Sequence, residues 1–163
     1  MSVKRNASAV ITAGLIFGFV IGAALGVLWW RLAPRIEVVV ESGQLVDFQT
    51  QGFLASDISY GALAIVAGLL VTIGLARMRR EHLLSVLVAG VLSGLVGSLA
   101  MWWIGHYLGR VDIAGLAGTQ SEVVEGPLVL HLGAMLLIWP IVAAMVVTVL
   151  AFEDWLAGLK KKS

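Results

Sequence analysis

The amino-acid sequence predicts an all-α integral membrane protein, with four transmembrane helices in an antiparallel bundle and a small outer β-hairpin. Of its 163 residues, 60% are hydrophobic and 13% are charged, and the mean hydropathy is +0.98. An ordinary soluble domain has about 25% charged residues. Four apolar segments are long enough to cross a bilayer, which takes roughly 20 helical residues. They lie in a single domain, at about residues 7–30, 58–77, 83–108 and 128–152.

The first segment carries a glycine at every fourth place, at Gly14, Gly18, Gly22 and Gly26. We call these four residues the glycine row. In water, each glycine would weaken a helix by about 1 kcal/mol relative to alanine. In lipid, a row of small residues lets two helix backbones approach closely. The glycine row therefore predicts a packing face, directed either at another helix of this chain or at a second copy or different subunit.

The second and third segments are expected to be antiparallel neighbours, because the loop between them is very short. Asp57 directly precedes the second segment and is a natural N-cap for it. The third segment offers its own small residues, including Gly90, Gly94 and Ser98. These positions predict a second helix-packing face.

The first outer loop, residues 31–57, contains two short runs rich in β-branched and aromatic residues. The runs cover 36–40 and 45–49, and Ser42 and Gly43 lie between them. This pattern is typical of a β-hairpin. A lone hairpin is barely stable, so we expect it to lean on the outer ends of the helices.

The fourth segment contains two prolines with different expected effects. Pro127 suits a first helical turn, whereas Pro140 falls near mid-span and predicts a kink. The neighbouring Trp139 has an indole N–H that needs a polar partner. Beyond this segment, we expect residues 153–160 to turn along the inner membrane interface.

Basic residues predict the orientation in a bacterial plasma membrane. Eight of the eleven lysines and arginines fall on one side of the predicted membrane. Because basic loops stay in the cytoplasm, both termini are expected to be cytoplasmic. We expect Trp29, Trp30, Trp102 and Trp103 to mark the outer interface. The eight basic residues are Lys4, Arg5, Arg77, Arg79, Arg80, Lys160, Lys161 and Lys162.

The polar residues give little support for chemistry. Ion pathways and proton relays normally leave charged residues inside the spans, and the centres of these segments contain none. The outer residues Asp57, Asp112, Glu122 and Glu125 show no paired spacing, so we expect solvated loop charges rather than an enzyme site. The chain has no cysteine, which excludes thiolate metal sites, Cys-ligated iron–sulfur clusters and c-type haem.

His106 and His131 are weak candidates for cofactor binding. Both are predicted at similar depth on adjacent antiparallel helices, where two imidazoles could ligate haem or a divalent metal. Their spacing matches no metal motif, and no carboxylate cluster accompanies them. We therefore expect structural histidines, and the sequence predicts no metal and no cofactor.

Several short stretches follow one another in a fixed order along the chain. They are Trp-Arg-Leu-Ala-Pro at 30–34, Ser-Gly at 42–43 after a valine-rich run, Phe-Leu-Ala-Ser-Asp at 53–57, Glu-Gly-Pro-Leu at 125–128 and Trp-Pro at 139–140. Together they resemble a family of small four-span membrane proteins of unknown function from actinobacteria. The resemblance covers about residues 30–144. It implies a plasma-membrane location and four spans, and it carries over no site residue.

The leading functional prediction is a non-enzymatic accessory or assembly subunit of a larger respiratory or cell-envelope complex. Its glycine row would dock against another membrane protein, and its other partners would be membrane lipids rather than nucleic acid. The alternative is a small homo-oligomeric channel or a transporter of lipids or small molecules. A third hypothesis is a haem or quinone site at His106 and His131.

Overall fold

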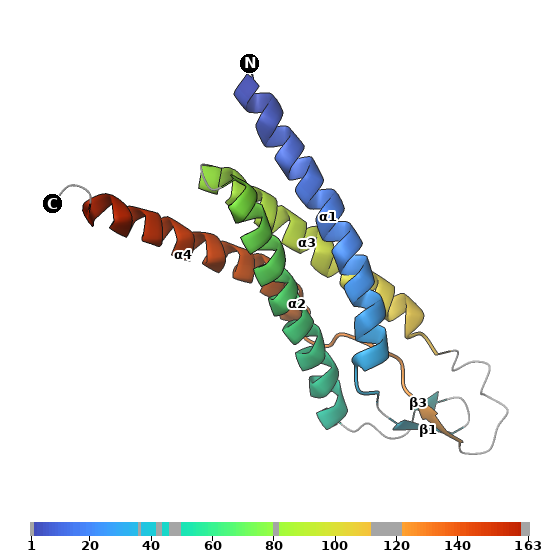
Figure 1. Ribbon diagram of the computed structural model, residues 1–163. Coiled ribbons are helices and arrows are strands. Elements are labelled where there is room, and N and C mark those ends of the chain that lie inside the picture. The colour runs from blue at the N-terminus through green and yellow to red at the C-terminus, as the bar shows by residue number, and fades with distance from the viewer. Residues whose placement is uncertain are drawn as a thin grey trace.

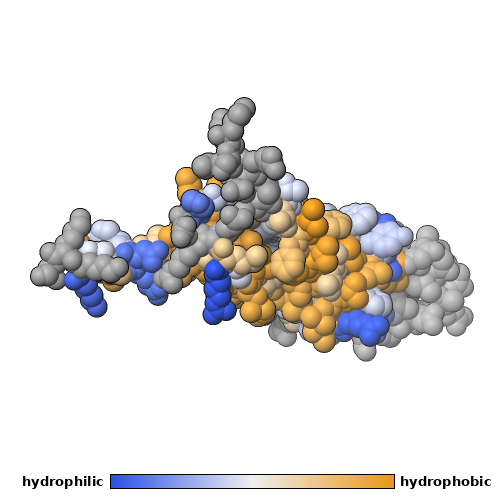
Figure 2. All heavy atoms as spheres, turned by 45° about the horizontal axis from the view of Figure 1, so that its top comes forward, coloured by the Kyte–Doolittle hydropathy of each residue, from blue (hydrophilic) through white to orange (hydrophobic). Residues whose placement is uncertain are grey.

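Four long helices dominate the computed structural model, which describes residues 2–35, 37–41, 44–45, 50–79, 82–111 and 122–160. Each helix contains a stretch long and apolar enough to cross a membrane. Figure 2 shows a broad hydrophobic surface over the middle of the molecule, with hydrophilic residues toward its ends, as expected for lipid contact. The prediction of four spans is therefore confirmed. The helices are α1 (Ser2–Leu32), α2 (Thr50–Arg79), α3 (Leu83–Leu108) and α4 (Ile138–Lys160), and the 3-10 helix η3 (Gly133–Leu137) precedes α4.

Helix α3 is the centre of the bundle and contacts each of the other three helices. Helix α3 runs parallel to α1, because successive glycines of the glycine row contact successive turns of α3 in the same N-to-C order. It runs antiparallel to α4, because Gly90 faces Ala143 whereas Gly94 faces Pro140. Away from the centre, the beginning of α1 and the end of α4 diverge (Figure 1).

Short strands lie at one end of the bundle, where Figure 1 labels β1 and β3. They are β1 (Glu37–Glu41), β2 (Gln44–Leu45) and β3 (Glu122–Glu125), paired antiparallel in the order β2-β1-β3. Residues 42–43 and 46–49 of the expected hairpin lie outside the described residues. The pairing of β1 with β3 joins the first outer loop to the loop between α3 and η3. The sequence did not predict this contact. We call this end of the bundle the sheet end, and the opposite one the terminal end.

Helix α2 begins at Thr50, earlier than the predicted start at residue 58. Asp57 is therefore not the N-cap of α2; it lies inside the helix and is 1% exposed. The extra turns extend the buried face of the helix, because Ser56 and Asp57 lie one turn before the buried Tyr60. Tertiary packing thus overrides the local cap signal at this position.

Helix α4 begins at Ile138 rather than at residue 128. Residues 126–132 are not helical, and η3 lies between them and α4. Pro127 therefore lies outside any helix. Pro140 is in the first turn of α4, where a missing N–H removes no hydrogen bond of the α-helix. The expected mid-span kink is wrong for this reason.

The end of α4 also differs from the prediction. The helix continues without a break to Lys160 instead of turning at residue 153. No proline interrupts this stretch, and Gly158 lies only in its last turn. Nothing local therefore stops the helix where the apolar segment ends.

Candidate functional site

The glycine row faces α3 of the same chain. A Cβ atom added at Gly18 would lie 2.5 Å from the carbonyl oxygen of Ser93, and one at Gly22 would collide with the backbone of Gly97. At Gly26 the nearest atom would be the carbonyl oxygen of Met101, at 2.7 Å. The hypothesis that this edge turns outward to a partner does not hold here, because α3 already covers it at backbone contact.

A second glycine face surrounds Trp139, whose side chain is 0% exposed. Cβ atoms added at Gly68 of α2 and at Gly94 of α3 would lie 3.2 and 3.0 Å from its Cδ1 atom, and one at Gly97 would lie 2.5 Å from its Cζ3 atom. These three glycines therefore make room for one indole in the middle of the bundle. One of the three is Gly94, which the sequence analysis placed on a helix-packing face. The indole Nε1 has no hydrogen-bond partner within the described part of the chain.

Trp29 is part of the core rather than of an interfacial belt. Its side chain is 0% exposed, and its ring contacts Gly105 of α3. Its Nε1 donates to the carbonyl oxygen of Ser56 at 3.2 Å, and its ring meets that of Tyr60 edge-on at 5.1 Å. A buried carbonyl partner satisfies the indole N–H, so this tryptophan does not need the wet interface. Trp103, in contrast, is 58% exposed, as expected for an interfacial position.

The buried carboxylate of Asp57 holds the chain just before η3. Its Oδ1 accepts the backbone N–H of His131 at 3.1 Å, and its Oδ2 accepts that of Leu132 at 2.8 Å. The start of a helix leaves such N–H groups without intrahelical partners. Asp57 is therefore not the solvated loop charge that the sequence predicted. It binds the start of η3 from another helix.

His106 helps to anchor the same segment from α3. Its Nδ1 lies 3.1 Å from the carbonyl oxygen of Leu128, and its ring stacks on that of Trp102 at 6.0 Å. The Leu128 N–H also donates to the carbonyl oxygen of Gly109. His131 belongs to this segment and donates its backbone N–H to Asp57, whereas His106 contacts the segment through its ring. Among the described residues, no group of three His, Cys, Asp or Glu side chains comes together.

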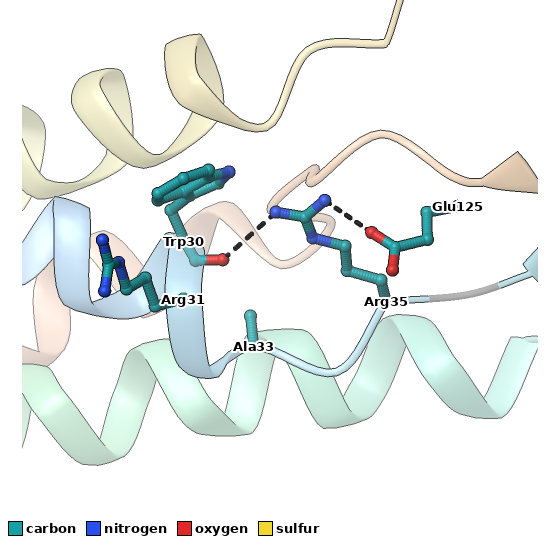
Figure 3. A pocket seen from close by; sticks show the side chains of 5 residues that line it. All are labelled: Trp30, Arg31, Ala33, Arg35 and Glu125. Atoms are coloured by element: carbon teal, nitrogen blue, oxygen red, sulfur yellow. Dashed lines mark hydrogen bonds and ion pairs between the residues drawn. The ribbon is translucent and has the colours of Figure 1, made fainter.

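A cavity of about 420 Å³ lies at the sheet end, next to the end of α1 (Figure 3). Arg35 crosses it: one Nη atom lies 2.6 Å from Oε2 of Glu125, and the other donates to the carbonyl oxygen of Trp30 at 3.4 Å. The five lining residues are Trp30, Arg31, Ala33, Arg35 and Glu125. We call this cavity the rim pocket.

The rim pocket combines two cations, one anion and one aromatic ring. The guanidinium carbons of Arg31 and Arg35 lie 5.9 and 5.7 Å from the Trp30 ring centroid, close enough for cation–π attraction. One local feature of the sequence indicates part of this arrangement: the two arginines follow Trp30 within five residues at a helix end. Their partner Glu125 is 90 residues away from Arg35 in the chain, and local spacing did not identify it.

Comparison of the chain with known protein families, curated proteins and solved structures finds no match. The helices define its class, which is a multi-pass membrane protein with four candidate spans.

Proposed function

We propose that this protein is a non-enzymatic accessory or assembly subunit of a larger plasma-membrane complex, of the respiratory or cell-envelope kind. The glycine row, which first suggested docking, is occupied within the chain. The proposal therefore rests on a different surface, provided by the second half of α4.

The course of α4 is the observation that carries the proposal. In its first half the helix is held by the bundle, and Trp139, Ala143 and Val147 are buried. Every residue from 151 to 160 is exposed, and this part of the helix leads away from the rest of the bundle (Figure 1). Only 22% of the apolar window of α4 is buried, as in α1, against 39% for α2 and 44% for α3. Its exposed face is therefore available to a transmembrane helix of another protein.

The chemistry of this face fits a partner within the membrane. Phe152 and Trp155 stack at a centroid distance of 5.8 Å, and both are more than half exposed. Aromatic side chains bring much contact area with little loss of rotamer freedom, and they are enriched at protein interfaces. Met145 and Val149 extend the same apolar surface toward the bundle.

The proposal also includes the orientation of the protein in the membrane and its relation to a protein family. The distribution of basic residues supports a cytoplasmic terminal end and an external sheet end. The short stretches described above support kinship with the actinobacterial four-span family.

Site-specific photo-crosslinking tests the proposal. A benzophenone amino acid at position 152 of α4 should give one discrete adduct with a different membrane protein when the chain is irradiated in its native membrane. The matched control is the same residue at position 70 of α2, because Leu70 is 69% exposed and Phe152 is 57% exposed. That control should yield no protein adduct.

Two results would contradict the accessory role. If position 152 reacted only with lipid, as position 70 should, the α4 face would be a lipid-covered surface. If the adduct contained two copies of this chain, the homo-oligomeric alternative would replace the proposal.

A further inference from the structure

We propose that the rim pocket binds the headgroup of a membrane phospholipid that carries both a phosphate and a primary amine, as ethanolamine phospholipids do. This inference concerns the sheet end and does not depend on the accessory role proposed for α4.

The phosphate would be held by the arginines. A guanidinium group is a planar fork of N–H donors that matches phosphate oxygens, and its charge persists at any physiological pH. Arg35 already shares its donors with Glu125 and the Trp30 carbonyl. Arg31 is exposed and lies over the Trp30 ring, and no carboxylate pairs with it among the described residues. Arg31 is therefore the principal phosphate ligand, with Arg35 beside it.

The amine would be held by Glu125. Its Oε2 accepts from Arg35, but a carboxylate has acceptor sites on both oxygens. Its side chain is 65% exposed, so a second donor can reach it. In this orientation the negative phosphate of the headgroup would lie beside the Arg31 guanidinium, and its positive ammonium would lie beside the Glu125 carboxylate. A headgroup without an amine would leave Glu125 facing a second negative charge.

The position of the pocket favours a lipid over a soluble ligand. Trp30 and Arg31 are in the last turn of the apolar window of α1, which ends at Leu32, and this is where bilayer headgroups lie when such a helix spans. The cavity of about 420 Å³ falls within the range of about 300–1,000 Å³ for small-ligand sites. The pocket therefore lies at the headgroup level of one leaflet and has room for one headgroup.

Arg110 provides an internal comparison. It is exposed at the same end of the bundle, and its guanidinium carbon lies 5.2 Å from the Tyr107 ring centroid. This pair reproduces the contact of Arg31 with Trp30 but is not part of the rim pocket. A general attraction of interfacial arginines to headgroups would act equally on Arg31 and Arg110.

Native mass spectrometry of the full chain in mild detergent tests the inference with phosphatidylethanolamine, phosphatidylcholine and phosphatidylglycerol of identical acyl chains. The wild type should retain phosphatidylethanolamine about tenfold better than either other lipid, which corresponds to about 1.4 kcal/mol. Arg31→Gln should reduce retention of all three lipids, and Arg110→Gln should change none. Glu125→Gln should abolish the preference for the amine headgroup, while the glutamine carbonyl still accepts from Arg35.

Three outcomes would overturn the inference. Equal losses in Arg31→Gln and Arg110→Gln would show general headgroup attraction. An unchanged lipid preference in Glu125→Gln, in a variant that melts at the wild-type temperature, would remove the amine from the site. Displacement of the lipid by an equimolar amount of glycerophosphoethanolamine, which lacks the acyl chains, would assign the pocket to a soluble ligand.

Discussion

Gly22→Leu is expected to separate α1 from α3 and to lower the melting temperature of the protein by roughly 10 °C, since overpacking costs about 1–3 kcal/mol or more. Even the first added carbon would collide with the backbone of Gly97. Backbone atoms cannot move aside as the end of a flexible side chain can. Gly97 itself is held on its other side by the ring of Trp139, so the collision would spread to α4.

The measurement is thermal unfolding in detergent, followed by tryptophan fluorescence because Trp29 and Trp139 are both fully buried. Gly74→Leu is the matched control. It puts the same side chain on α2 at a glycine with nothing within 4 Å, and it should leave the melting temperature nearly unchanged. Gly14→Ala should also be tolerated, because its Cβ would lie 3.5 Å from that of Ala89. Equal melting temperatures for Gly22→Leu and Gly74→Leu would refute the packing seen between α1 and α3.

The glycine row illustrates how far the sequence alone reaches. Its four-residue period establishes that one edge of α1 is bare, and small residues in lipid imply close contact. The same period would be found whether the edge faced α3 or another protein. Only the position of Ser93 and Gly97 at backbone contact decides between them. Hydropathy predicted the spans, whereas the choice of neighbours depends on contacts distant in the chain.

The misassigned residues share one physical cause. Asp57 precedes an apolar run and Trp29 ends one, so local rules place both at a boundary with water. Each has a hydrogen-bond partner far away in the chain: Ser56 accepts from Trp29 across 27 residues, and His131 donates to Asp57 across 74 residues. A helical spacing of Asp57, Tyr60 and Ala64 was present in the sequence and could have indicated an earlier start of α2.

The candidate sites also differ in how far local sequence predicts them. His106 was predicted to be structural, and the Leu128 carbonyl beside its ring is a partner of that kind. The rim pocket was not predicted, because Arg31 and Arg35 come from the end of α1 whereas Glu125 comes from strand β3. Pairing of β1 with β3 brings these parts of the chain together, and no local sequence pattern predicts that pairing.

Asp57→Ala is expected to release the segment before η3 and to destabilise the protein by roughly 2–4 kcal/mol, because a hydrogen bond to a charged group contributes about 1.5–3 kcal/mol. The change removes the acceptor from two backbone N–H groups, those of His131 and Leu132. Asp57→Asn keeps one carbonyl oxygen and should cost about half as much. The measurement combines thermal unfolding with hydrogen exchange resolved at individual amides.

Hydrogen exchange separates the two roles considered for this carboxylate. If Asp57 holds the start of η3, its loss should speed exchange at the His131 and Leu132 amides and leave the amides at 58–60 protected. If it were the N-cap of α2, as the sequence alone suggests, the faster exchange would appear at 59 or 60 instead, because an N-cap side chain accepts from the second or third residue after it. Residues 131 and 132 directly precede η3 whereas residues 58–60 are in α2, so a loss of protection at both places would reveal general unfolding. Unchanged exchange at residues 131 and 132 in a folded Asp57→Asn variant would contradict the contact.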